Sequence, residues 1–449
     1  MTTPETTLET AERVLRLVAD RAAGAEAEVT VTTGTAALTR FANSFIHQNV
    51  AEEVSHVLVR VALDGRVAST SFDGAPTDDA LGRVVGNALE AARVRPPDPE
   101  WPGLAGPAEA PDAGHWDDST AAADPDDRAA RVADFVAAAV GLETAGACES
   151  EALTVAFANS AGQRLTGRTT AASIDGIART PSSDGSGRHV AVRLADIDGG
   201  SVGARAARKA RDGAEPADLE PGRYEVVLEP GCVADLLQFL ILYGFNARAV
   251  EEGRSFVRIG ERQFDERISL ADNVADPRQS GLAFDAEGTP RAKLELIGRG
   301  VTRGVIHTRR TAARAGTAST GHAVEGGEGF GALPVAPVLA AGEGTLDELV
   351  GAVERGLLVT DFWYTRVLDP RTQVVTGLTR NGVWLIEDGA VVRPVSNLRF
   401  TQSYLEAVAP GGVGQVGGEP ELVSTGWGTT YLVPPLRLAS WNFSGGARG

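Results

Sequence analysis

The most hydrophobic stretch of the chain follows a short strand-like run at the start of its second half. Residues 224–228, YEVVL, end at Glu229-Pro230-Gly231, and an apolar block then extends over residues 233–245. Proline fits the first helical turn without losing a hydrogen bond, so Glu-Pro-Gly predicts a helix start. The length and continuity of the apolar block predict a buried helix.

The first part of the chain predicts a helix, a set of strands and a second helix. Residues 7–20 carry an apolar stripe typical of an amphipathic helix, with Thr6-x-x-Glu9 as its capping box. Alternating runs follow, and Asp64-Gly65 between two of them predicts a hairpin. A helix is expected from Pro76 to about Ala92.

A second unit of the same composition follows. Residues 94–120 are rich in proline and glycine, which predicts a linker or a surface loop. Asp124-Pro125 then predicts a helix start. The apolar stripe of this helix consists of Val132, Phe135, Val136 and Val140. Extended segments and an alanine-rich helix over about residues 201–211 complete a second α+β unit, although no residue-level repeat supports a duplication.

From Pro221 onward the pattern becomes mostly β. Short runs are separated by the turn dipeptides Glu287-Gly288, Asn381-Gly382 and Asp388-Gly389, and residues 345–355 predict a short helix. The predicted class is therefore α+β, with a two-part N-terminal α+β region and a mostly β C-terminal domain that contains one buried apolar helix. The expected units are an N-terminal α+β domain (1–93), a linker or surface loop (94–120), a central α+β domain (121–215) and the C-terminal domain (221–449).

Composition narrows the class of partner. Lysine and arginine total 42 against 60 acidic residues, and the net charge of −18 argues against nucleic acid or an anionic membrane as a partner. No apolar stretch reaches the roughly 18 residues of a membrane span, and the N-terminus lacks signal-peptide features. The two cysteines cannot form a disulfide framework and fit a reducing compartment. A cytoplasmic protein is expected.

The histidines give little support for a metal site. No two have the helical spacing of a zinc-peptidase helix; they are His47, His56, His115, His189, His307 and His322. His47 and His56 lie on successive extended segments and could approach each other across a sheet. Two histidines fix neither a metal nor a mechanism, so structural or surface roles are favoured.

Three further features could form a catalytic or binding site. Cys232, beside the predicted helix start, could be an activated thiol, but a small buried hydrophobe is the favoured interpretation. The glycine-rich residues 316–331 could bind phosphate, but prolines intervene where a helix should follow, and a substrate- or partner-facing loop is favoured. Arg254, Ser255, Arg258 and Arg262 could bind an anion or a peptide carboxylate, although an arginine-bearing surface is favoured.

Several segments, in order along almost the whole chain, resemble the TldD/PmbA family of cytoplasmic metallopeptidases. They include TSFDG (70–74), EPGCVADLLQFL (229–240), EEGRSF (251–256), FDAEGTPR (284–291), ASTGHA (318–323), RFANSFIHQNV near the N-terminus and VVTGLTRNGVWLIEDGAVVRPVSNLRFTQ near the C-terminus. The resemblance implies one of two subunit types. The TldD type carries a zinc-binding HExxxH helix and a further cysteine ligand toward the C-terminus. The TldE (PmbA) type lacks both and completes an enclosed peptide-degrading chamber.

The resemblance places this chain with the TldE type. When the metal helix of the family is laid on LLQFLILYGFN, Gln238 and Phe239 stand where histidine and glutamate would, and Tyr243 where the second histidine would. Residues 190–306 contain no histidine, and no cysteine follows Cys232. The resemblance therefore implies no catalytic residue, metal or cofactor in this chain.

The implied function is that of the non-metal partner of a zinc-bearing TldD-type subunit, with peptides as substrates. A heterodimer is expected, and a homodimer is the alternative. The positions expected to face peptide or partner are Arg254, Ser255, Phe256, Ser319, Thr320, Gly321, Thr376, Gly377 and Thr379. Two other functions stay open: a self-sufficient homodimeric hydrolase, and a non-catalytic peptide-binding or assembly protein.

Overall fold

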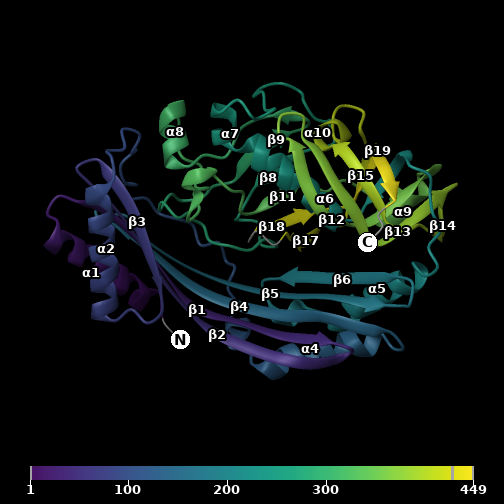
Figure 1. Ribbon diagram of the computed structural model, residues 1–449, viewed down its shortest axis with the longest axis horizontal. Helices are drawn as coiled ribbons and strands as arrows, with labels where there is room; N and C mark the ends of the chain where they lie inside the picture. Colours follow the sequence, from purple (N-terminus) through teal and green to yellow (C-terminus); the bar gives the residue numbers. More distant parts are fainter. Residues whose placement is uncertain (1–2, 426–428, 447–449) are drawn as a thin grey trace.

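A six-stranded antiparallel sheet of unusually long strands carries the first half of the chain (Figure 1). The computed structural model describes residues 3–425 and 429–446. The strand order is β3-β2-β1-β4-β5-β6. The strands are β1 (Glu26–Ala42), β2 (Phe45–Leu63), β3 (Arg66–Asp73), β4 (Glu143–Asn159), β5 (Arg164–Arg179) and β6 (Asp184–Ala191). Because β1 pairs with both β2 and β4, the ranges 1–93 and 121–215 contribute strands to one continuous sheet.

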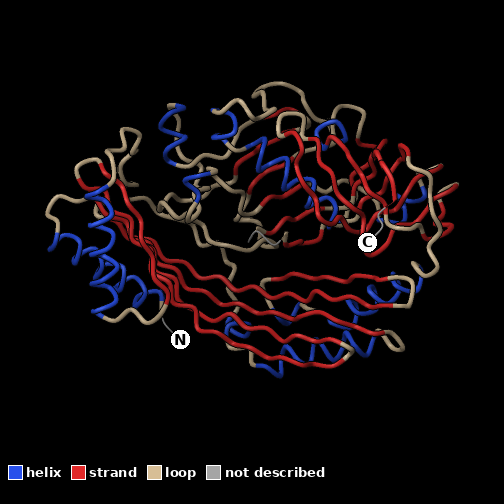
Figure 2. The backbone as a smooth tube through the Cα atoms, viewed as in Figure 1, coloured by secondary structure: helices blue, strands red, loops and turns tan. Residues whose placement is uncertain are grey.

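Helices cover one face of this sheet, and its other face turns toward the C-terminal half (Figures 1 and 2). One apolar cluster packs the first two helices on β1–β3, and another packs the later two on β4 and β5. The helices are α1 (Pro4–Arg21), α2 (Asp78–Val94), α3 (Asp118–Ala121), α4 (Pro125–Ala138) and α5 (Gly199–Asp212), with a 3-10 turn, η1 (Leu194–Asp196). No helix in the described ranges is both long and apolar enough to cross a membrane.

Two expectations about these helices are wrong. The capping box of α1 is formed by Thr3 and Thr6 instead of Thr6 and Glu9, because the helix already begins at Pro4. Helix α4 ends at Ala138, so Val140 lies beyond its apolar stripe and is 73% exposed. The predicted start at Asp124-Pro125 is confirmed, with Asp124 as N-cap.

The segment between the two α+β ranges is anchored to the rest of the protein. Residues 95–117 contain no helix or strand, and they run over both halves. The side-chain amide of Asn159 donates to the carbonyl of Ala105 (2.7 Å). His115 is 1% exposed, and its ring nitrogens lie 3.0 and 3.2 Å from the carbonyl oxygens of Gly281 and Asp276. This segment therefore ties the sheet to the C-terminal half.

The C-terminal half contains two further sheets. One has the order β12-β7-β19-β15-β13-β14, and an additional β12–β13 pairing closes β12, β7, β19, β15 and β13 into a barrel. The strands of this sheet are β7 (Gly222–Leu228), β12 (Arg355–Asp369), β13 (Val374–Glu387), β14 (Ala390–Pro394), β15 (Leu398–Ser403), β16 (Val413–Val416) and β19 (Leu436–Gly446). The second sheet consists of β8 (Leu270–Asp272), β9 (Leu294–Gly298), β10 (Val301–Thr302), β11 (Pro337–Leu339), β17 (Glu421–Ser424) and β18 (Thr430–Val433).

Short helices connect these strands: α6 (Pro230–Leu240), η2 (Ile241–Phe245), α7 (Ala247–Glu251), α8 (Arg309–Ala315), η3 (Gly327–Gly329), α9 (Leu346–Gly351) and α10 (Tyr404–Ala407). With 25% helix and 40% strand, and a mostly β C-terminal part, the predicted α+β class is confirmed.

The turn predictions succeed where the dipeptide has positive φ at the end of a hairpin. Asp64 and Gly65 (φ 51° and 71°) join β2 to β3, and Asp388-Gly389 joins β13 to β14. The prediction for Asn381-Gly382 is wrong because this pair lies inside β13. Both residues have positive φ, and they lie opposite a shift in the β12–β13 register between Val359 and Asp361.

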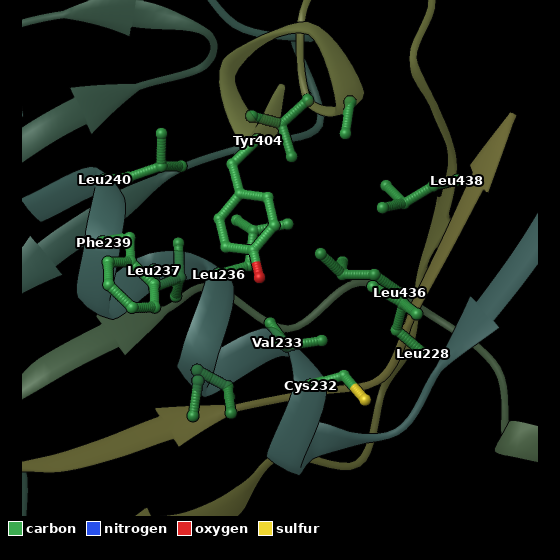
Figure 3. Packing of buried hydrophobic residues seen from close by; sticks show 14 of the residues in the cluster. Leu228, Cys232, Val233, Leu236, Leu237, Phe239, Leu240, Tyr404, Leu436 and Leu438 are labelled. Carbon is green, nitrogen blue, oxygen red and sulfur yellow. The ribbon is translucent and has the colours of Figure 1, made fainter. Parts of the chain in front are cut away.

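The apolar helix α6 lies at the centre of the largest hydrophobic cluster (Figure 3). Glu229 is its N-cap and Pro230 occupies its first turn, which confirms the predicted start. Leu236 and Leu237 of this helix are at most 2% exposed, and the same cluster includes Tyr404, Leu436 and Leu438 (Figure 3). The α-helix ends at Leu240, and residues 241–245 continue it as one π-helical turn.

Candidate functional site

A cleft lies between the free face of the six-stranded sheet and the C-terminal half. Its volume is about 740 Å³, and its walls come from β1, β2, β4 and β5 on one side and from residues 280–286 and 323–325 on the other. A second cavity of about 290 Å³ continues it toward the first turn of α6 and β17. The two cavities share Glu149, Ser173, Val190 and Ser424, so they form one continuous groove.

The sheet wall of the cleft is acidic. Glu52, Glu149 and Glu151 line it, and Glu325 faces it from the C-terminal half. Burial, together with the nearby Glu149, raises the pKa of Glu151. Sequence reasoning missed these residues, because Glu52 and Glu149 are brought to one wall by strand pairings between distant segments.

Two of the family-like segments pack against each other at the base of the cleft. The carboxylate of Asp285 accepts a hydrogen bond from the backbone N–H of Ala323 (3.0 Å). The guanidinium of Arg291 donates to the carbonyl of Gly321 (2.7 Å). His322 is fully buried, with its Nδ1 atom 2.8 Å from the hydroxyl of Thr320. FDAEGTPR and ASTGHA therefore form one hydrogen-bonded brace.

A buried ion cluster connects this brace to the sheet. Arg60 of β2 lies 2.6 Å from Glu28 of β1, and the two side chains are 9% and 5% exposed. The same guanidinium lies 3.8 Å from Glu287 and 3.2 Å from Glu328. Burial, with the nearby carboxylates of Glu287 and Asp285, raises the pKa of Glu28 to about 7 against the lowering effect of Arg60. The cluster fixes the C-terminal half on the sheet.

The glycine-rich segment 316–331 is held to the same strand by a histidine. His47 and His56 both lie on β2, so the expectation that they approach each other across a sheet is wrong. His56 instead places its ring nitrogens 2.8 Å from Asp73 and 3.1 Å from Glu325. Burial lowers the pKa of His56, but the two carboxylates outweigh it and raise that pKa overall.

The side chains of α6 and of the following turn η2 do not fit a zinc site. Phe239 and Tyr243 stack on each other, with ring centroids 6.2 Å apart. In the described part of the chain, the buried Oε1 atom of Gln238 has no hydrogen-bond partner. Zinc needs three or four nitrogen, sulfur or carboxylate ligands that converge on one point. Within residues 3–425 and 429–446, no group of three or more His, Cys, Asp or Glu side chains could hold a metal ion.

The one carboxylate of α6 is engaged elsewhere. Asp235 accepts hydrogen bonds from the hydroxyls of Tyr404 (2.7 Å) and Thr365 (2.8 Å). Burial raises the pKa of Asp235 to about 6, and these two hydrogen bonds oppose the rise. The network joins α6 to α10 and β12, and each oxygen of the carboxylate accepts one of the two hydrogen bonds.

Cys232 behaves as a buried hydrophobe. Its side chain is 0% exposed, and its Sγ atom donates to the carbonyl of Val359 at 3.7 Å. Burial raises the pKa of the thiol well above its usual value. A nucleophile needs the thiolate and access to substrate, and this position provides neither.

The nine positions expected to face peptide or partner fall in three separate places. Ser319, Thr320 and Gly321 belong to the brace, where the hydroxyl of Ser319 donates to the carbonyl of His307 (3.3 Å). Thr376, Gly377 and Thr379 lie on β13 of the barrel.

The remaining three positions follow α7. Arg254 pairs with Glu252 at the surface, and the hydroxyl of Ser255 donates to the carbonyl of Gly244 (2.6 Å). Phe256 is 7% exposed, and its ring packs in the core against Phe245.

The larger arginine set near α7 also makes local contacts. Arg258 pairs with Glu261, and Arg262 donates to the carbonyl of Arg299 (2.9 Å). Arg258 and Arg262 are exposed, which fits the favoured interpretation of an arginine-bearing surface.

The C-terminal half matches a known family model, and two curated relatives share part of the sequence. Residues 221–445 match the family model described as the PmbA/TldA metallopeptidase C-terminal domain. Over 194 residues the chain is 27% identical to a protein of Buchnera aphidicola named metalloprotease TldD homolog, which covers 42% of this chain and 39% of that protein. Over 238 residues it is 22% identical to a protein of Methanothermobacter thermautotrophicus named metalloprotease, covering 51% of this chain and 50% of that protein. The matched parts thus span half or less of these relatives.

A solved structure extends the similarity to the whole fold. The crystal structure of TldE from Thermococcus kodakarensis superimposes with a TM-score of 0.87 at 19% sequence identity, and the match covers 97% of this chain and 100% of that chain. At this identity the likeness is one of fold.

Proposed function

The chain belongs to the PmbA/TldD metallopeptidase family, and on that premise we propose that it is the TldE-type partner subunit of a two-component zinc peptidase. In this proposal the chain binds no metal and no cofactor. A TldD-type subunit supplies the zinc, the hydroxide and the general base. Together the two would cleave small or unfolded peptides in the cytoplasm, for proteolysis or for the maturation of peptide natural products.

Helix α6 is the observation that carries this proposal. The family-like scaffold around it is kept, but Gln238, Phe239 and Tyr243 occupy the positions that the resemblance assigns to ligands and base. Phe239 belongs to the hydrophobic core, the half-buried Tyr243 packs against it, and Asp235 is held by two hydroxyls. A helix that presents neither histidine nor glutamate at these positions can hold the shape of a chamber while the chemistry belongs to another chain.

In this proposal the groove of this chain holds the peptide. β17 is an edge strand, and its residues 421–424 line the smaller cavity. An edge strand offers free backbone donors and acceptors to which an extended peptide can add as a further strand. The acidic wall beside it would attract basic side chains of that peptide.

The test compares the chain alone with the chain co-expressed with a candidate HExxxH-bearing partner from the same organism. Both preparations are assayed on mixed peptides with and without a metal chelator. The expected result is hydrolysis by the complex, abolished by chelator, and none by the chain alone.

Each alternative has its own outcome in the same assay. Robust hydrolysis by the metal-free chain would establish a self-sufficient, homodimeric hydrolase instead. Peptide binding without hydrolysis in either preparation would favour a binding or assembly protein.

A further inference from the structure

One outer face of the C-terminal barrel combines exposed aromatic rings with arginines. It lies on the adjacent strands β12, β13 and β15 (Figure 1). The register aligns Trp363, Leu378 and Arg399 in one row across these strands, and Arg366, Thr376 and Thr401 in a second row. We call this surface the arginine–aromatic face; it consists of Trp363, Tyr364, Arg366, Leu378, Arg380 and Arg399.

A backbone irregularity exposes its two large aromatic side chains. Neighbouring residues of a regular strand point to opposite faces, so consecutive exposed rings require a break in the alternation. The β12–β13 register shifts between Trp363 and Arg366, and Tyr364 has φ +54°. As a result Trp363 is 52% exposed and Tyr364 is 64% exposed. Left-handed backbone at a tyrosine is unfavourable, and such strain concentrates at functional positions.

Arginines are stacked on both rings, and among the described residues they have no acidic partner. The guanidinium carbons of Arg380 and Arg366 lie 4.3 Å from the ring centroids of Trp363 and Tyr364. Within the described ranges, neither of these arginines nor Arg399 has a carboxylate oxygen within 4.0 Å. The face is therefore a basic patch on a chain whose net charge is −18.

We propose that the arginine–aromatic face docks an acidic surface of a different protein chain. Tryptophan, tyrosine and arginine are the residues that dominate the energy of protein interfaces, and stacking holds these arginines ready to bind carboxylates. A second copy docked face to face, with the twofold axis through this surface, would bring the arginines of both copies together, and like charges oppose that contact. The acidic net charge of the chain opposes nucleic acid as the occupant.

This inference rests on the proposed function, because the TldD-type subunit is the chain to which the acidic surface is assigned. It adds the place on the barrel where that subunit docks and the negative charge of the surface that it presents. Thr376, one of the positions expected to face peptide or partner, lies in the second row of the face.

The experiment uses the full chain and three variants. The first is the charge reversal Arg366→Glu/Arg380→Glu/Arg399→Glu, and the second is Trp363→Ala/Tyr364→Ala. The matched control is Arg16→Glu/Arg83→Glu/Arg93→Glu, which makes the same charge change at exposed positions of α1 and α2. Each is co-expressed with the candidate HExxxH-bearing chain, and the Kd is measured at two salt concentrations after circular dichroism verifies the fold.

The inference predicts a Kd at least about tenfold weaker for both face variants, an unchanged Kd for the control, and weaker wild-type binding at high salt. A complex that tolerates both face variants would overturn the docking face and leave the proposed function standing. No complex with the wild-type chain would overturn both. Wild-type self-association that the face variants abolish would show that a second copy docks there and would contradict the inference.

Discussion

The buried ion cluster around Arg60 offers a quantitative test of how the two halves are joined. Replacing Arg60 by methionine keeps the packing of its aliphatic stem and removes the charge that faces Glu28 at 2.6 Å. Glu28 would then be a buried carboxylate with a second one, Glu287, beside it. Breaking a buried pair by removing one partner costs about 3–5 kcal/mol, and we expect a loss of that size in the free energy of unfolding at pH 8.

The sign of the pH dependence follows from Glu28. Its folded-state pKa, about 7, lies above the unfolded value of 4.5, so its contribution to stability is fully present below pH 4.5 and is lost as the pH rises through about 7. Without Arg60 the pKa of Glu28 rises further. Lowering the pH from 8 to 5 then protonates the carboxyl and removes the unpaired charge. The destabilisation caused by Arg60→Met is therefore expected to be smaller at pH 5 than at pH 8.

Urea unfolding of the wild type, Arg60→Met, Glu28→Gln and the double variant at both pH values measures these effects. Removal of both charges is expected to restore part of the loss, because Glu28 no longer carries an unpaired charge while Glu287 still loses the guanidinium 3.8 Å away. A loss below about 1 kcal/mol for Arg60→Met at pH 8, or a double variant no more stable than the single one, would refute the assignment of this cluster to the junction.

Other contacts lead to further predictions. In Gly288→Ala the new Cβ atom would lie 2.2 Å from a buried phenylalanine ring of β4, at a backbone φ of +69°. We expect the free energy of unfolding, measured by heat or urea, to fall by about 2–4 kcal/mol. The control Gly253→Ala has φ +65° but open space around it, and its expected loss is about 1–2 kcal/mol. Tyr404→Phe removes a hydrogen bond that stabilises the ionised form of Asp235 and lowers its pKa. Because that pKa, about 6, lies above the unfolded value, Asp235 is ionised at pH 8 and largely protonated at pH 5, so the expected loss in the free energy of unfolding, about 1.5–3 kcal/mol, is larger at pH 8. A loss that does not depend on pH would contradict this prediction. Glu151→Gln removes a charge from the acidic wall, and fluorescence titration of the complex should show a severalfold weaker affinity for lysine-rich peptides and an unchanged affinity for neutral ones.

The sequence predicts those features that depend on neighbours in the chain. Asp64-Gly65 and Asp388-Gly389 make their hairpins because positive φ at both residues is a local requirement. Asn381-Gly382 has the same local chemistry, but its strand partner β12 continues past it, and the pair becomes an irregularity within β13. A tertiary pairing thus overrides the local turn signal.

The candidate site depends on contacts that no local pattern encodes. The pairing of β1 with β4 joins residues more than a hundred positions apart, and it brings Glu52 and Glu149 to one wall. Phe256 belongs to a polar, family-like segment, yet its ring fills the space beside Gly244 in the core. The apolar helix is the exception, because continuous hydrophobicity alone was enough to predict its burial.

The metal content of the separated chains tests the central claim most directly. This chain is purified alone and as a complex with the candidate HExxxH-bearing partner, and zinc is measured by mass spectrometry across the size-exclusion profile. The account predicts zinc that elutes with the partner and the complex, in proportion to the partner, and none with this chain alone. One equivalent of zinc bound to this chain alone would contradict it, because α6 would then hold a metal that its side chains do not fit.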